Sequence, residues 1–314
     1  MNHSHFSKIK THIHQFFFLP ARSEPLAALR IGLCSILLWQ AYCVGPLLFE
    51  LYGQEGIIQG KIASYFAPVT PHITGMTRLM MPWGISETTV LTVISILYLT
   101  FVACFLVGFQ SRITGIGTWF THMLLAQGHT ASYGFDAYAH IFLFYLAFTP
   151  SGTSWSIDSK FKPSTPSPWN RLSLRTLQLH VAIAYCASAI EKATGIQWWN
   201  GDAIWRSLML PIYRQHIPVE WIAQIPWIAM VAGWATLAIE AFYPFLIFPQ
   251  KTRPLWIVLV MALHLGIVFF LGLHIFGIFM CVLTFALFAF SSEPETPILV
   301  FQKGPQPLRE KVVS

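Results

Sequence analysis

The stretch PLWIVLVMALHLGIVFFLGLHIFGIFMCVLTFALFAFS, residues 254–291, contains no Asp, Glu, Lys or Arg. A helix needs about 20 mostly apolar residues to cross the hydrocarbon core of a bilayer. The stretch is long enough for two crossings, and the glycines between residues 272 and 277 suit the tight turn that must separate them. We therefore predict spans at 254–273 and 275–291. The pattern indicates an all-α integral membrane protein.

The composition of the whole chain agrees with that class. Of the 314 residues, 55% are hydrophobic and 10% are charged, whereas soluble domains have about 25% charged residues. The mean hydropathy is +0.57, and the 12 Trp residues suit the aromatic belts at membrane surfaces. The net charge of +6 comes mostly from loops between apolar runs. We therefore expect a membrane-lipid environment and no nucleic-acid partner. No metal site is expected either.

Six further apolar segments bring the predicted number of spans to about eight. They lie at 26–48, 88–109, 112–128, 135–150, 172–194 and 222–248. The prediction is one polytopic membrane domain over 26–292, preceded by a cytoplasmic or interfacial segment, 1–25, and followed by a cytoplasmic tail, 293–314. Between the fourth and fifth spans, the Pro- and Ser-rich segment Pro150–Trp169 predicts an extended linker.

The charges in the loops predict the orientation of the chain. With the N-terminus inside, the outer loops contain only Lys61, Arg78, Arg206 and Arg214, and most other Lys and Arg residues fall in the inner loops. Cytoplasmic loops carry the excess of Lys and Arg, so we predict that both termini are cytoplasmic. The membrane is expected to be a plasma or inner membrane. Arg30, early in the first span, is expected to extend to the inner headgroups.

Ionisable groups placed against or inside the spans are the candidate functional residues, because charge is costly in a bilayer. The stretch YCASAIEKATGIQWWNGDAIWR, residues Tyr185–Arg206, ends the fifth span with a carboxylate, an amine and a Trp pair. The predicted topology brings several such groups toward one depth, where we expect an outward-facing cavity. Among these groups are Asp136, His140, Glu191, Lys192 and His264. The other candidate site residues are Glu240, an acid inside the sixth span, and the Trp pair after the fifth span, Trp198 and Trp199.

A structural role is also compatible with several of these residues. Lys192 can extend to the outer headgroups, with Glu191 neutralising it. His264 can hydrogen-bond a neighbouring helix. Glu240 must either have a partner or be protonated. The residues alone leave both interpretations open.

Several segments, in this order, resemble the HTTM family, the membrane domain shared with vitamin K-dependent gamma-glutamyl carboxylase. They are EPLAALRIGL (24–33), LVGFQSRITGIG (106–117), SYGFDAYAHIFLFYLAFTPSGTSWSID (132–158), YCASAIEKATGIQWWNGDAIW (185–205) and ALHLGI (262–267). The resemblance covers roughly residues 20 to 292.

This resemblance implies a role for Lys192. It matches the position of the lysine that acts as the base activating reduced vitamin K in the carboxylase, and His264 matches the family's late-span histidine. Glu191 stands where the carboxylase tends to have a second basic residue, which is a departure. The chain also stops soon after its last span, so a carboxylase of the clotting-factor type is not expected.

The leading hypothesis from the sequence is a membrane-embedded epoxidase- or carboxylase-like enzyme that acts on reduced vitamin K or another quinone. Lys192 would be the base, His264, His140 and Asp136 its partners in the cavity, and Trp198 and Trp199 a wall. Short members of the family also resemble an SdpB-like protein needed to mature a secreted toxin peptide. The alternative is therefore a non-catalytic maturation or export factor that binds a hydrophobic peptide. A transporter is a third possibility.

Overall fold

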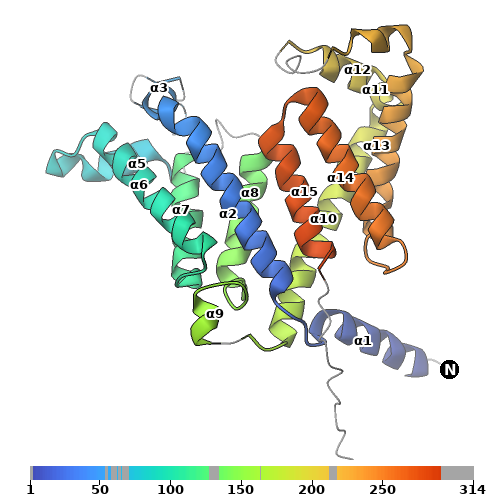
Figure 1. Ribbon diagram of the computed structural model, residues 1–314, viewed down its shortest axis with the longest axis horizontal. Coiled ribbons are helices and arrows are strands. Elements are labelled where there is room, and N and C mark those ends of the chain that lie inside the picture. Colours follow the sequence, from blue (N-terminus) through green and yellow to red (C-terminus); the bar gives the residue numbers. More distant parts are fainter. Residues whose placement is uncertain are drawn as a thin grey trace, which may run out of the picture.

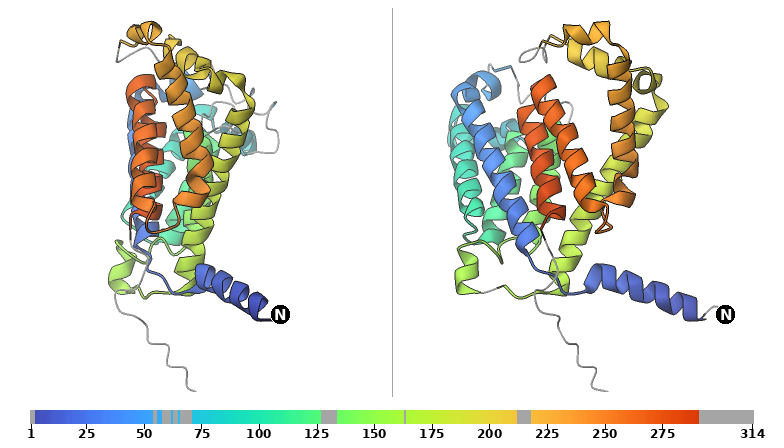
Figure 2. Two further views of the ribbon diagram at one scale, coloured as in Figure 1. Left: turned by 90° about the vertical axis from the view of Figure 1, so that its right-hand side faces the viewer. Right: turned by 45° about the vertical axis from the view of Figure 1, so that its right-hand side comes forward.

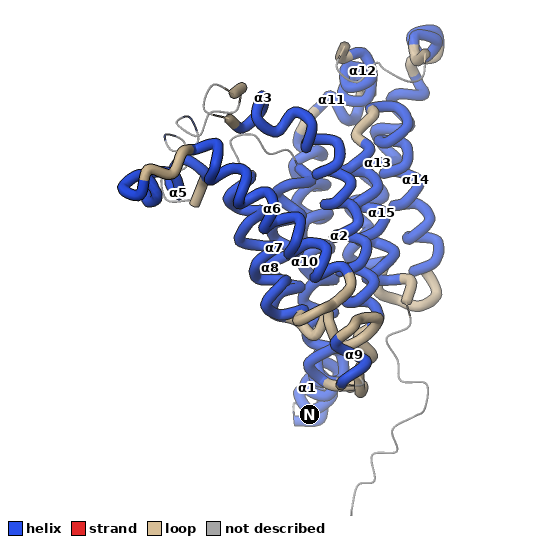
Figure 3. The backbone as a smooth tube through the Cα atoms, turned by 60° about the vertical axis from the view of Figure 1, so that its left-hand side comes forward, coloured by secondary structure: helices blue, strands red, loops and turns tan. Residues whose placement is uncertain are grey.

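The computed structural model describes residues 3–53, 56–57, 62, 65, 71–126, 134–162, 164–211 and 218–290. Every regular element within these ranges is a helix (Figures 1 and 3). The elements are α1 (His3–Phe18), α2 (Glu24–Val44), η1 (Gly45–Leu47), α3 (Leu48–Tyr52), α5 (Ile73–Met80), η2 (Met81–Trp83), α6 (Glu87–Leu106), α7 (Ser111–Leu125), α8 (Gly134–Phe148), α9 (Asp158–Phe161), α10 (Pro168–Thr194), α11 (Ile196–Trp199), α12 (Asp202–Met209), η4 (Glu220–Gln224), α13 (Trp227–Leu246), α14 (Arg253–Leu271) and α15 (His274–Phe288).

Each of the eight predicted spans contains one long helix: α2, α6, α7, α8, α10, α13, α14 and α15. Within the described ranges, four helical segments can cross a membrane by length and composition, namely Glu24–Tyr52, α6, α13 and α14, and α8 and α15 are shorter apolar helices. The chain is therefore membrane-embedded, whereas the count of eight crossings stays a prediction.

One predicted boundary differs from the structure, and one predicted turn is confirmed. The predicted span 222–248 begins only at Trp227, because Pro226 disfavours helical backbone at the preceding Ile225, whose ψ is 64°. The tight turn predicted between the last two spans is present. Gly272 ends α14 with a left-handed φ of 67°, a conformation that costs glycine little.

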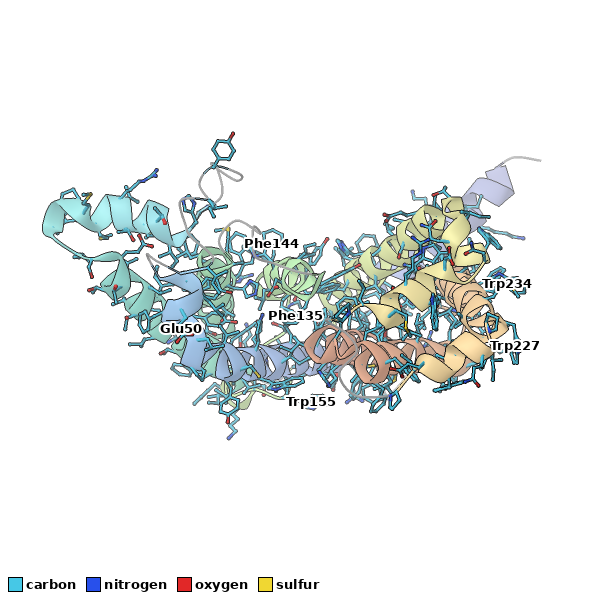
Figure 4. The ribbon with its side chains drawn as sticks, turned by 90° about the horizontal axis from the view of Figure 1, so that it is seen from above. Glu50, Phe135, Phe144, Trp155, Trp227 and Trp234 are labelled. Atoms are coloured by element: carbon cyan, nitrogen blue, oxygen red, sulfur yellow. The ribbon has the colours of Figure 1, made fainter. Side chains whose placement is uncertain are left out.

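The helices form a bundle whose core runs through both halves of the molecule (Figure 4). On one side α2 packs on α6, α6 on α7 and α7 on α8; on the other, α10 packs on α13 and α14 on α15, and α15 also packs on α2. Viewed from above, Glu50 lies at one end, Trp227 and Trp234 lie at the other, and Phe135 lies between them.

Helix α1 and the end of α15 lie at the same end of the bundle (Figure 2). An even number of crossings requires this arrangement, but the side of the membrane stays a prediction. The predicted tail, 293–314, lies outside the described residues. We call the end of the bundle that carries α1 the near end, and the opposite end, with α11 and α12, the far end (Figure 1).

Arg30 does not reach the headgroups as the sequence suggested. Its side chain in α2 is fully buried. It donates hydrogen bonds to the backbone oxygens of Ser151 (2.7 Å) and Trp155 (2.6 Å). Trp155 adopts a φ of 47°, which is uncommon for a bulky residue. The guanidinium thus holds the segment after α8 against α2, and this segment is folded rather than an extended linker.

Asp158 attaches the same segment to the start of α7. Its carboxylate accepts hydrogen bonds from the Gln110 N–H (2.8 Å), the Ser111 N–H (2.8 Å) and the Ser111 hydroxyl (2.7 Å). Burial alone would raise the pKa of Asp158, but the hydrogen bonds from Ser111 and Gln110, helped by the charge of Arg30, outweigh it and lower that pKa.

We expect Arg30→Ala to destabilise the protein strongly, because two buried hydrogen bonds from a charged donor are lost. Such bonds contribute about 1.5–3 kcal/mol each. Thermal unfolding of the purified protein in detergent measures the loss. The control is Arg22→Ala, which removes a local, partly exposed ion pair with Glu24; pairs at the surface are worth about 0–1 kcal/mol. Equal midpoints for the two variants would contradict this role of Arg30.

We expect Asp158→Asn to lower stability by about 0.5–2 kcal/mol at neutral pH, as loss of a helix cap does. Because the folded-state pKa of Asp158 is lowered, its contribution is complete above the usual value of about 4. It is lost as the pH falls through the lower folded-state value. Thermal midpoints across this pH range should therefore converge for the two proteins in acid. A gap that stays constant with pH would refute the assignment.

Candidate functional site

A cavity of about 570 Å³ lies among α10, α13 and α14, with α11, α12 and η4 at its far end (Figure 1). Its walls are mostly apolar, and a few polar side chains converge on it. Those polar side chains are Tyr138, Tyr185, Ser188, Lys192, Trp198, Ser207, Thr236, Glu240 and His264. A pocket of this size and character is typical of small-molecule sites.

Lys192 and Glu240 form an ion pair on the cavity wall. The Lys192 Nζ lies 3.0 Å and 2.9 Å from the two carboxylate oxygens of Glu240, whose side chain is 9% exposed. The Nζ also donates to the Ser188 hydroxyl and lies 5.2 Å from the centre of the Trp198 ring. The amine thus has a carboxylate, a hydroxyl and an aromatic face around it.

The sequence of α10 explains the position of Lys192. The helix begins with Ser167, which accepts a hydrogen bond from the Asn170 N–H (3.1 Å), and with Pro168 in its first turn. Both are favourable at a helix start. Lys192 stands in the last turn, where the helix dipole favours a cation. Glu240 comes from α13, which packs along α10.

A second polar contact lies on the same wall. The Tyr185 hydroxyl is 2.7 Å from Nε2 of His264, which joins α10 to α14. His264 is 4% exposed, and its Nδ1 has no hydrogen-bond partner within the described ranges. The Tyr185 ring stacks on Tyr243 at 4.1 Å. Within the part of the chain that the structure describes, His264 thus uses one of its two ring nitrogens in a hydrogen bond.

The structure brings together four of the predicted site residues, Lys192, Trp198, Glu240 and His264. Glu191, although adjacent to Lys192 in sequence, is exposed. Trp199 is 47% exposed and donates through its indole to the Ala193 oxygen (2.9 Å). Neither residue lines the cavity, because successive residues of a helix point about 100° apart.

Asp136 and His140 do not lie at this cavity either. The Asp136 carboxylate accepts from the Gln40 amide (2.8 Å) and lines a separate pocket of about 260 Å³ between α2, α6, α7 and α8. The His140 Nε2 accepts from the Trp119 indole (3.1 Å). The predicted site residues thus do not converge on one cavity but lie in both halves of the bundle.

Tyr185 and Ser188 belong to the site, although the sequence did not single them out as site residues. A signal was available, because Tyr185, Ser188 and Lys192 are spaced three and four residues apart and so share one face of a helix. Helical spacing could not predict that Glu240 is the partner of Lys192. Glu240 is 48 residues away, on a helix whose neighbours only the tertiary structure specifies.

The family model of the HTTM domain matches residues 57–292. This match covers more than half of the chain and confirms the resemblance drawn from the sequence. No curated protein and no solved structure matches the chain significantly.

We expect Gly233→Ala to destabilise the far end of the site. A Cβ at Gly233 would lie 2.5 Å from the Trp198 oxygen, so α11 would have to move off α13 together with the Trp198 ring. Overpacking of this kind costs about 1–3 kcal/mol. The matched control is Gly266→Ala on α14, where a Cβ meets nothing within 4 Å.

The control should keep or raise the thermal midpoint in detergent, because alanine is a better helix former by up to about 1 kcal/mol. The same midpoint for both alanine variants would contradict the close approach of α11 to α13.

Proposed function

The chain belongs to the HTTM family, and on that premise we propose that it is a membrane enzyme for a quinone or similar lipid-soluble substrate. The activity would be epoxidase- or carboxylase-like, with reduced vitamin K or another quinol as the substrate. Lys192 would be the base. The plasma or inner membrane is the proposed location.

The observation that carries the proposal is the Lys192–Glu240 ion pair on the wall of an apolar cavity. Burying two charges costs more free energy than their attraction usually returns, so such a pair is weak evidence for stability alone. Ionisable residues within membrane helices are functional candidates by default. The apolar walls suit a ring that partitions into the bilayer, and the pair offers it a polar contact.

The geometry suggests a route for the proton. Lys192 can accept a proton only after its ammonium has given one up, and Glu240 is the acceptor in contact with it. Transfer from Nζ to the carboxylate leaves a neutral amine and a carboxylic acid. The amine then takes the proton of a substrate hydroxyl. The net step moves one proton from the substrate to Glu240, and Lys192 ends as it began.

His264 would hold the substrate at a second point. Its Nδ1 is a buried polar atom without a hydrogen-bond partner among the described residues, and Tyr185 fixes the ring through Nε2. Tyr185 and Lys192 are seven residues apart on α10, which is about 10 Å along a helix. A ring with oxygen atoms on opposite sides suits two contacts arranged in this way. Trp198 would close the far end over Lys192.

The proposal is tested by oxygen-dependent conversion of reduced vitamin K to its epoxide and water by the purified protein in detergent. We expect Lys192→Ala to lower turnover by about 100-fold or more, as loss of a general base does. The matched control is Glu191→Ala, which removes the adjacent but exposed carboxylate and should leave turnover unchanged.

Two results would count against the proposal. Equal turnover in Lys192→Ala and the wild type would remove Lys192 from the chemistry. If the wild type itself has no turnover and a hydrophobic peptide co-purifies with it, the maturation or export factor becomes the better interpretation.

A further inference from the structure

Helices α13 and α14 are consecutive in the chain but separate from each other along the cavity. They meet near their connecting turn, where the Trp256 indole donates to the Ile239 oxygen (3.2 Å). Beyond that point α13 packs along α10 and α14 along α15, so the two helices diverge toward the far end (Figures 1 and 2). Both line the cavity.

The space between them, the α13–α14 slot, is lined by small and apolar side chains. These are Ala232, Ala235 and Ile239 on α13, and Ala262, Gly266 and Phe270 on α14. Both helices are long and apolar enough to cross a membrane, so an opening between their middle parts would face the bilayer. The far end, in contrast, has α12 and η4 over it, with Trp221 and Leu208 on the cavity wall.

Helix packing does not explain why residue 266, on the wall of the slot, is a glycine. A Cβ at Gly266 meets nothing within 4 Å. A Cβ at Gly277 on α15, which packs on α14, would lie 2.4 Å from Val268. Glycine in a helix interior is unfavourable relative to alanine. Gly277 is needed for the close packing of α15 on α14, but no packing contact requires Gly266.

We propose that the α13–α14 slot holds the apolar chain of a single-chain, small-headed lipid that enters from the bilayer, and that Gly266 sets the width available to that chain. The placement of the lipid head at Lys192 rests on the proposed function, but the placement of the lipid's apolar chain in the slot does not. Phospholipid is excluded as the intended occupant because its zwitterionic head would lose water on entering the cavity. The charge of Lys192 is already neutralised by Glu240, so an unpaired ionic head there would be costly.

Photo-labelling of the full-length protein in phosphatidylcholine nanodiscs tests the proposal. The probe is the methyl ester of palmitic acid, whose head is small and uncharged, with a diazirine in its chain, and labelled residues are mapped by mass spectrometry. We expect label on the slot residues of α13 and α14 in the wild type. Gly266→Leu should lose this label, and Gly266→Ala should reduce it less, because the larger side chain fills more of the slot.

The matched control is Leu265→Phe, which enlarges the residue next to Gly266. Leu265 is 38% exposed and does not line the cavity. Its slot labelling should equal that of the wild type. The thermal midpoint of Gly266→Ala should not fall below the wild-type value, since its Cβ meets nothing within 4 Å.

Three results would overturn the proposal: no slot label in the wild type, undiminished label in Gly266→Leu, or equal slot label from phosphatidylcholine carrying the same diazirine chain. Labelling needs no turnover. Slot label in a protein without quinol epoxidation would therefore keep the slot and remove the proposed enzyme activity.

Discussion

A charge inside a bilayer must find its partner within the same protein, and this requirement organises the structure. Lys192 on α10 faces Glu240 on α13, and Arg30 on α2 bonds to backbone oxygens after α8. Water cannot solvate these groups in hydrocarbon. Each pairing therefore joins helices that are distant in sequence, and removing either partner leaves an uncompensated polar group.

The two pairings differ in what surrounds them. Arg30 is fully buried and contacts only protein, so it behaves as a structural clamp on the near end. Lys192 is 22% exposed at its side chain and borders a cavity. An ion pair that borders a cavity can exchange a proton with a ligand bound there, whereas a fully buried charge cannot. This difference is why the half of the bundle that contains α10, α13 and α14 is the better candidate for chemistry.

The pairing of Lys192 also bears on its departure from the carboxylase pattern. Glu191 stands where the carboxylase tends to have a second basic residue. In the folded chain Glu191 is exposed, and the carboxylate in contact with Lys192 is Glu240. The acid next to the amine in space is thus a different residue from the acid next to it in sequence. Its position suits it to receive the amine's proton.

The sequence by itself determined the membrane class, the HTTM family and the approximate positions of the long helices. Apolar length and loop punctuation are local properties, and the stretch 254–291 displays both. It also picked out Lys192, Glu240, His264 and Trp198, because charge or polarity in an apolar run is visible without a fold. Only the tertiary structure decided which of these residues meet. Asp136 and His140 lie in the other half of the bundle, and Glu240 rather than Glu191 contacts Lys192. Contacts between helices depend on packing angles and on partners far away in the chain, and helical periodicity does not encode either one.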